Sequence, residues 1–223
     1  MSNMSDRSFS FVPGSFFHVY NRGNSRQSIF LDSHDYRRFS TLLYISNSNE
    51  SFKLHFIKKP YDVERGALLV SIGAYCLMPN HFHILLTPCV EGGVSLFMKK
   101  LTTAYSMYFN NRYERTGSLF EGRYKASIAD NDVYLKYLYA YIHLNPLKLI
   151  QPEWKTNGVG DVHEAKKYLR LYNFSSYKEY IGETRKEKLI LDTTPFPKYF
   201  LSRDDFEKNI FAWFDENKQV GPV

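Results

Sequence analysis

The sequence has few of the features that mark secreted or membrane proteins. Only two cysteines, Cys76 and Cys89, occur among its 223 residues, and no Cys-x-x-Cys pair indicates zinc binding. No basic segment followed by an apolar one stands at the N-terminus, and no apolar run approaches the length of a membrane span. We therefore expect a cytoplasmic protein with no membrane partner, in which both cysteines are core residues.

The sequence also lacks glycine spacing of the Walker type, so a nucleotide cofactor is not expected. What it has in abundance is positive charge and aromatic side chains. The formal net charge is +6, and there are 18 tyrosines and 18 phenylalanines. This composition fits a partner that offers phosphates and stackable bases. Taken alone, it fits a solvated basic surface around an aromatic-rich core even better, so the motifs must decide.

Hydrophobic periodicity predicts alternating strands and helices over the first 146 residues. Asp32 or Ser33 can cap the first helix, and residues 130–132 supply the cap and first-turn acids of the last one. Residues 46–65 are polar and basic and predict either a long connection or an extension of a strand. The expected order is a strand over 15–21, a helix over 33–45, a central strand over 68–77, a strand over 81–87, a helix over 93–113, a strand within 117–129 that carries Arg123 and Lys125, and a helix ending around 145–146.

This order predicts the fold class and the domain organisation. Split βαβ connections of this kind build a four-stranded antiparallel sheet with helices on one face. We therefore predict an α+β, ferredoxin-like βαββαβ fold with an extra helix after the last strand. Residues 1–12 are polar and serine-rich, so we predict that they form a flexible N-terminal arm. We expect residues 13–150 to form the main domain, and residues 151–223 to form a polar C-terminal extension that wraps the core.

The tripeptide His81-Phe82-His83 is the most informative motif. Alternate side chains of a strand share a face, so the two histidines point one way and Phe82 points the other, toward the helices. Two imidazoles on one face need polar partners or a divalent metal ion. Imidazole suits manganese, cobalt, iron or zinc, whereas magnesium would need further oxygen ligands. A pair of structural histidines is the ordinary alternative, and the tripeptide alone does not exclude it.

The last predicted helix offers further candidates. It carries four tyrosines, Tyr134, Tyr137, Tyr139 and Tyr141, among which helical periodicity does not choose. Tyr141 and Asn145 stand four positions apart and so share one helical face. From that face the amide oxygen of Asn145 could coordinate a metal ion. His143 would point away from Tyr141 and serve packing or support.

Five sequence blocks occur in a fixed order. They are HVYNRGN at 18–24, MPNHFH at 78–83, GSLFEGRYK at 117–125, YIHLNP at 141–146 and SSY at 175–177. Together they resemble the REP-associated tyrosine transposases, relatives of the single-tyrosine, IS200-like HUH transposases, over about residues 14–182. The resemblance implies that His81, Phe82 and His83 form the HUH motif. It also implies that Tyr141 is the nucleophile, that Asn145 is the polar residue four positions later, and that residues 13–150 form the catalytic domain.

The resemblance implies cleavage and rejoining of single-stranded DNA. A divalent metal ion, Mg²⁺ or Mn²⁺, on His81, His83 and Asn145 would bind the scissile phosphate while Tyr141 attacks it. A free phenol has a pKa of about 10, so the cation must assist. The products would be a 5′-phosphotyrosine and a free 3′-hydroxyl, which a second strand could rejoin. The expected partner is DNA with hairpin-forming repeats, bound by a monomer or a homodimer.

Basic residues near the predicted strands and helices are the candidates for DNA contacts. Ordinary surface charge is the alternative for about half of them. The candidates are Arg22, Arg26, Lys99, Lys100, Arg112, Arg123 and Lys125.

Three other functions are compatible with the motifs. A replication initiator or relaxase would use the same metal and tyrosine chemistry. A domesticated DNA-hairpin-binding protein would bind without cutting. A metal hydrolase would use the two histidines with water as the nucleophile, and would form no covalent protein–DNA species.

Overall fold

Four antiparallel strands form one sheet at the centre of the molecule. The computed structural model describes residues 10–53 and 56–214, so most of the predicted N-terminal arm, residues 1–9, lies outside the described residues. The strands are β1 (Phe16–Arg22), β2 (Val70–Met78), β3 (His81–Pro88) and β4 (Lys125–Ala129). Their order, β2-β3-β1-β4, is that of the predicted ferredoxin-like fold, which is confirmed.

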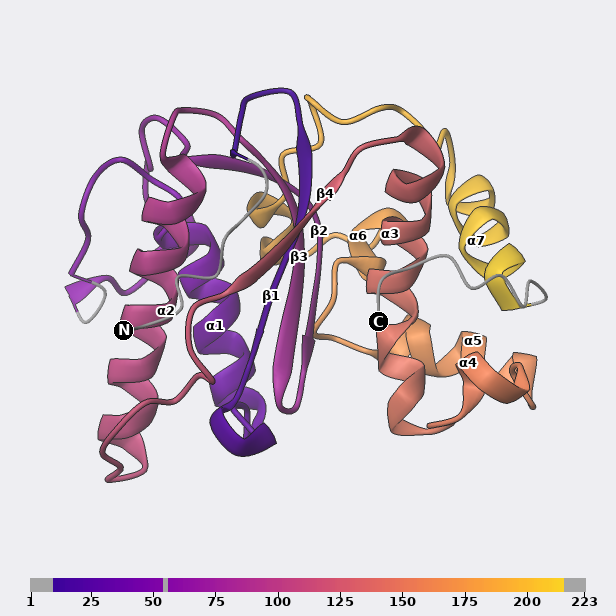
Figure 1. Ribbon diagram of the computed structural model, residues 1–223, viewed down its shortest axis with the longest axis horizontal. Coiled ribbons are helices and arrows are strands. Elements are labelled where there is room, and N and C mark those ends of the chain that lie inside the picture. Colours follow the sequence, from indigo (N-terminus) through magenta and orange to yellow (C-terminus); the bar gives the residue numbers. More distant parts are fainter. Residues whose placement is uncertain (1–9, 54–55, 215–223) are drawn as a thin grey trace.

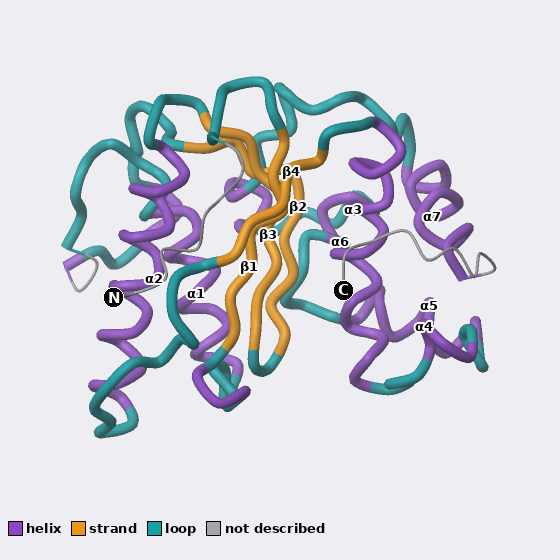
Figure 2. Tube along the Cα trace, in the orientation of Figure 1, coloured by secondary structure: helices purple, strands orange, loops and turns teal. Residues whose placement is uncertain are grey.

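Helices cover both faces of the sheet (Figures 1 and 2). The helices α1 (Ser33–Ile45) and α2 (Gly93–Arg112) share one face, as the βαββαβ order predicts. The extra helix α3 (Asp132–Leu144) packs on the opposite face together with the C-terminal part of the chain. Side chains of β3 alternate accordingly: Phe82 belongs to the core under α1 and α2, and Leu85 to the core under α3.

Capping side chains fix where the helices begin. The Asp32 carboxylate accepts hydrogen bonds from the backbone N–H groups of His34 and Asp35, and Asn131 accepts one from Tyr134. Both caps satisfy donors that have no partner within the first turn. The predicted starts of α1 and α3 are therefore confirmed.

The prediction that the apolar strand is central in the sheet is wrong, because this strand, β2, forms an edge of the sheet. Every residue of β2 is nevertheless buried. The reason is that later parts of the chain pair with its free side: the Leu77 N–H donates to the Phe174 carbonyl, and the Ser176 N–H donates to the Tyr75 carbonyl. The sequence predicted burial correctly, but the C-terminal extension supplies it.

Two further predictions are corrected. Cys76 is a core residue as expected, whereas Cys89 is exposed because it follows the end of β3. Arg123 does not lie on a strand, since β4 begins only at Lys125. Residues 46–65 form the predicted connection, which includes a short 3₁₀ helix, η3 (Pro60–Asp62), and the undescribed pair 54–55.

The C-terminal extension consists of short helices joined by loops. Its packing against α3 completes the second core, and Phe206 and Trp154 are buried there. No helix in the described part of the chain is long and apolar enough to cross a membrane. The elements are η4 (Asn145–Leu149), α4 (Trp154–Asn157), α5 (Val162–Leu171), α6 (Tyr177–Tyr180), η5 (Lys186–Ile190), α7 (Arg203–Phe211) and η6 (Ala212–Phe214), and η1 (Asn24–Arg26) follows β1 near the start of the chain.

Candidate active site

The two histidines of β3 lie side by side on the face of the sheet that α3 covers. Their ring centroids are 4.9 Å apart, and each uses Nδ1 for a hydrogen bond. His81 Nδ1 is 2.6 Å from the Asn80 side-chain oxygen, and His83 Nδ1 is 2.8 Å from Nε2 of His18 on β1. This arrangement leaves Nε2 of both rings for another partner.

The helix α3 brings Tyr141 and Asn145 to the same place. The Tyr141 ring centroid is 5.3 Å from that of His83. Asn145 is fully buried, and its side-chain N–H donates to the Tyr141 carbonyl at 3.0 Å. That bond orients the amide so that its other atom, Oδ1, points away from the helix carbonyls. Residues more than fifty positions apart in the sequence thus meet at one site.

These residues fit a divalent metal ion. His83 Nε2 and Asn145 Oδ1 are both buried without a hydrogen-bond partner, which is costly unless a cation or a bound water uses their lone pairs. No group of three or more His, Cys, Asp or Glu residues in the described chain could hold a metal. The candidate ligands are therefore two imidazoles and one amide oxygen, a set that suits Mn²⁺ better than Mg²⁺.

Burial keeps both imidazoles neutral, as metal ligands must be. It lowers the pKa of His81 to about 4, with help from Lys148, although the nearby Asn145 amide opposes the shift. The pKa of His83 lies well below its ordinary value because of burial and the neighbouring His18 and His81. Each neutral ring keeps a lone pair on one of its two nitrogens over the whole physiological range.

Two lysines that the sequence analysis did not select surround the tyrosine. Lys155 of α4 has its ammonium 4.0 Å from the Tyr141 ring centroid, and Lys148 of η4 lies 6.0 Å from it. Lys155 is exposed along part of its length, but desolvation of the ammonium, together with Lys148, lowers its pKa to about 8. Burial raises the pKa of Tyr141, and contact with the Asn145 amide opposes the rise.

His143, predicted to point away from Tyr141, does so. Its Nδ1 lies 2.9 Å from the Tyr139 carbonyl and its Nε2 lies 2.7 Å from the Ser176 hydroxyl. It therefore joins α3 to the block at 175–177, whose Ser176 also bonds to β2. These two sequence blocks, far apart in the chain, therefore contact each other in the fold.

Three of the seven predicted DNA contacts lie on the same face as the candidate site or at its rim. Lys125 is exposed and pairs across the sheet with Tyr20, which in turn pairs with His83. Arg22 pairs with His81 but forms an ion pair with Glu121. Arg26 is exposed in the turn after β1, close to this rim.

Two others are committed to contacts within the protein. The Arg112 guanidinium bonds to Asp32 and to the fully buried Asp35 carboxylate. The Lys100 ammonium donates to the backbone carbonyls of residues 48 and 50. These cations hold α2 against α1 and the following loop, so the structure does not bring them to the histidine site.

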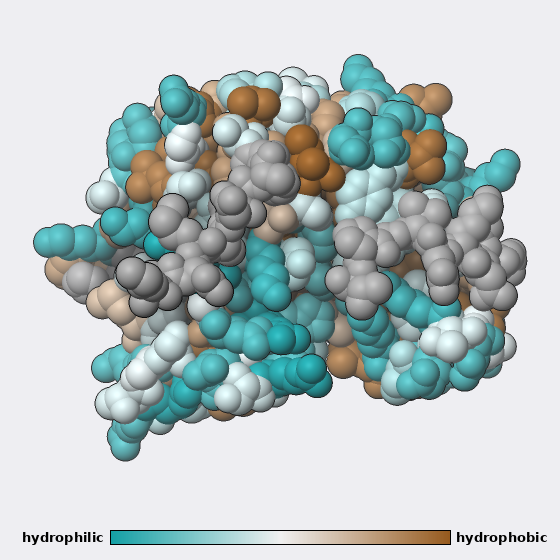
Figure 3. Space-filling view, in the orientation of Figure 1, coloured by the Kyte–Doolittle hydropathy of each residue, from teal (hydrophilic) through white to brown (hydrophobic). Residues whose placement is uncertain are grey.

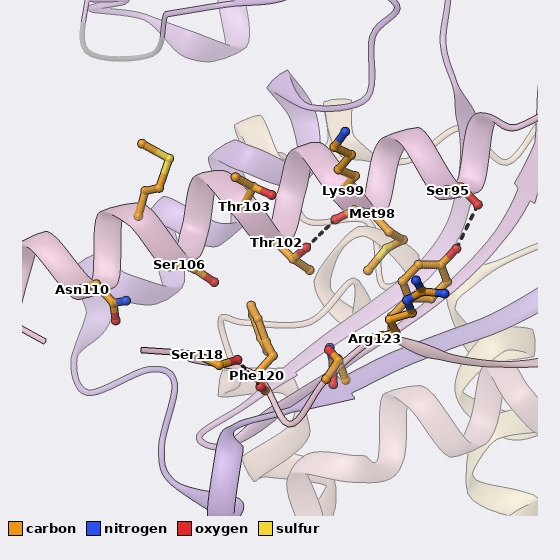
Figure 4. Close-up of a pocket in the computed structure, with 14 residues that line it drawn as sticks. Ser95, Met98, Lys99, Thr102, Thr103, Ser106, Asn110, Ser118, Phe120 and Arg123 are labelled. Carbon is orange, nitrogen blue, oxygen red and sulfur yellow. Dashed lines mark hydrogen bonds between the residues drawn. The ribbon is translucent and has the colours of Figure 1, made fainter. Parts of the chain in front are cut away.

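Lys99 and Arg123 line a separate groove between α2 and the loop before β4 (Figure 4). Its volume is about 950 Å³, and hydroxyl and amide side chains from α2 face the loop across it. Because α2 covers the face of the sheet opposite α3, this groove and the histidine site lie on different sides. Figure 3 shows hydrophilic side chains gathered over the lower part of this view, where α2 and the strands end.

His18 is the other functional candidate that the sequence analysis did not select. It is 6% exposed, bonds to His83, and its ring centroid is 5.7 Å from that of Tyr141. Strand alternation could have placed it on a face with Tyr20, but not beside a particular histidine of another strand.

The comparisons with known proteins agree with the sequence motifs. Residues 65–145 match the family model described as "Transposase IS200 like". No curated protein matches the chain. Among solved structures, a REP-associated tyrosine transposase bound to a REP hairpin is similar with a TM-score of 0.48 and 14% identity, over 82% of this chain and 90% of that one. The matched segment, residues 65–145, includes the two histidines, Tyr141 and Asn145, and its family is the one that the motifs resemble.

Proposed function

We propose that this protein is a metal-dependent endonuclease and strand transferase for single-stranded DNA, with Tyr141 as its nucleophile. The observation that carries the proposal is the pair of unpartnered buried atoms, His83 Nε2 and Asn145 Oδ1, directly beside Tyr141. A divalent cation would satisfy both lone pairs at once, and a nucleophilic role accounts for a tyrosine held next to it. The family match of residues 65–145 supports the same chemistry.

The metal ligands and Tyr141 have different roles in the proposed cleavage. A divalent ion bound by His81, His83 and Asn145 would offset the charge of the scissile phosphate. The Tyr141 oxygen loses its proton and forms a bond to phosphorus, while the bond from phosphorus to the 3′ oxygen breaks. The released 3′ oxygen takes up a proton. The DNA 5′ phosphate then remains on Tyr141, and attack by a 3′-hydroxyl reverses the step without a nucleotide cofactor.

The positive charge around Tyr141 favours this step. Burial alone makes the phenol harder to ionise. Lys148 and Lys155 on the segment after α3 stabilise the developing phenolate and attract the phosphate. We assign to Lys125, which lies on the same sheet face, a contact with the DNA backbone further along.

The test is to incubate the protein with an end-labelled single-stranded hairpin oligonucleotide from repeats flanking the gene, in Mn²⁺, Mg²⁺ or EDTA. We expect a metal-dependent protein–DNA band that survives SDS. Tyr141→Phe should abolish this band and leave hairpin binding within a few-fold. Tyr137→Phe is the matched control, because Tyr137 lies one turn earlier on α3 and packs against Tyr141.

Other outcomes identify the alternatives. Cleavage without a covalent band, unaffected by Tyr141→Phe, would indicate a metal hydrolase that uses water. Tight hairpin binding with no cleavage in any metal would indicate a DNA-binding protein that no longer cuts. A covalent band that persists in Tyr141→Phe would move the nucleophile to another tyrosine.

A further inference from the structure

We propose that His18 is a positioning residue that fixes the tautomer of His83 and thereby makes His83 a metal ligand. The inference rests on the proposed metal site and adds a residue to it. His18 lies on β1, and its Nε2 is 2.8 Å from Nδ1 of His83. Both rings are buried, at 6% and 5% exposure, so water does not compete for this bond.

The bond allows two arrangements of one proton. A neutral imidazole carries a hydrogen on one nitrogen only. If His83 carries it on Nδ1, His83 donates to His18 and its Nε2 presents a lone pair. If His18 donates instead, His83 must carry its own hydrogen on Nε2.

The surroundings of His83 Nε2 choose between the two. That atom is buried and has no hydrogen-bond partner. A hydrogen on Nε2 would therefore be a buried donor without an acceptor, and it would also block coordination. A lone pair on Nε2 can instead bind a cation, and Asn145 Oδ1, next to Tyr141, likewise has no hydrogen-bond partner. The first arrangement is the one that a metal ion selects, and it requires an acceptor at position 18.

His18 also restricts how the His83 ring can turn. The planes of the two rings differ by 28° and their centroids are 5.0 Å apart, which suits a hydrogen bond in the ring planes. The Tyr20 ring centroid lies 5.0 Å from that of His18. The His18 ring meets Tyr141 edge-on at 5.7 Å. A single side chain on β1 thus contacts both the candidate ligand and the candidate nucleophile.

The first test is a long-range ¹H–¹⁵N NMR spectrum of the metal-free wild-type chain, which reports imidazole tautomers. We expect His83 in the form protonated on Nδ1. A His83 ring protonated on Nε2 would overturn the inference. This readout needs no variant and no metal, so it separates the inference from the proposed activity.

The second test measures Mn²⁺ affinity by the EPR signal of free Mn²⁺. His18→Leu removes the acceptor while it keeps an apolar side chain, and we expect binding about 10- to 100-fold weaker. His18→Gln offers an amide oxygen near the same place and should recover most of the affinity. Tyr20→Phe, which alters the neighbour of His18 on the same face, should bind as wild type does.

The outcomes are distinct. A folded His18→Leu protein that binds Mn²⁺ within three-fold of wild type would overturn the role of His18. A wild-type protein that binds no Mn²⁺, with His83 protonated on Nδ1, would refute the proposed metal site and leave the tautomer assignment standing. If His18→Leu does not fold, the comparison of His18→Gln with wild type and the NMR spectrum decide.

Discussion

The ammonium of Lys155 lies 4.0 Å from the centre of the Tyr141 ring. The two residues belong to different helices, α4 and α3, and Lys155 comes from the segment that the sequence analysis treated as a wrapping extension. The contact places a positive charge against the face of the candidate nucleophile, where it stabilises the phenolate more than the phenol.

Replacing this cation should slow DNA cleavage. We expect Lys155→Met to reduce the rate of covalent adduct formation about 5- to 10-fold with little change in hairpin affinity, because the developing phenolate loses its nearest cation. Because the pKa of Lys155 is about 8, its charge is lost above that pH, and the advantage of wild type should shrink there. Lys136→Met is the matched control, since Lys136 lies 4.8 Å from the ring of Tyr199, away from the site. Equal rates for Lys155→Met and wild type at pH 7 would refute this role.

Changing Asn145 should separate metal binding from folding. Asn145→Ala removes the unpartnered Oδ1 and should weaken Mn²⁺ binding about 10-fold. Asn145→Asp keeps an oxygen but buries a negative charge next to neutral histidines. We expect its melting temperature to be lower than that of wild type without metal, and to rise more when Mn²⁺ is added. Thermal unfolding with and without Mn²⁺ measures both effects, and an equal rise in wild type and Asn145→Asp would argue against coordination by residue 145.

Acid should destabilise the protein through its buried histidines. Burial lowers the pKa of His18 and His143 to about 3 and that of His81 to about 4, whereas an unfolded histidine titrates near 6.5. Between these values the unfolded chain binds more protons than the folded one, so the free energy of unfolding falls as the pH drops below 6.5. The limiting slope is about 1.4 kcal/mol per pH unit for each such group.

The pH dependence can be assigned to one group with a single variant. His143→Leu removes a buried histidine that lies apart from the two candidate ligands. Urea unfolding between pH 6.5 and pH 5 should give a shallower slope for this variant than for wild type. An unchanged slope would mean that His143 is not neutral in the folded protein.

The basic residues should fall into two functional groups. Lys125→Ala should weaken binding of single-stranded DNA and reduce the slope of log K against log salt concentration by about 0.7, since one phosphate contact is lost. Arg112→Ala should leave that slope unchanged and lower the melting temperature, because the buried Asp35 carboxylate loses its ion pair with Arg112. Salt titrations and thermal melts of both variants test this assignment of Lys125 to DNA binding and Arg112 to stability. A salt slope reduced by Arg112→Ala but not by Lys125→Ala would contradict it.

Much of the fold follows from local sequence signals. The alternation in residues 81–87 determines that His81 and His83 share a face, and Asp32 and Asn131 determine where two helices begin. The four-residue spacing of Tyr141 and Asn145 determines that they lie on one side of α3. These properties depend on residues near each other in the chain, so periodicity and capping rules are sufficient to predict them.

The other features of the fold and of the candidate site were decided only by the tertiary structure, because these features depend on contacts between distant segments. The edge position of β2 is hidden in the sequence, since pairing with residues around 174–176 buries it as fully as a central strand. Composition could not distinguish Lys125, which lies on the active-site face, from Arg112, which Asp35 neutralises. The bond between His18 and His83 forms because β1 pairs with β3 in one particular register, and a one-residue shift would turn His18 to the other face of the sheet.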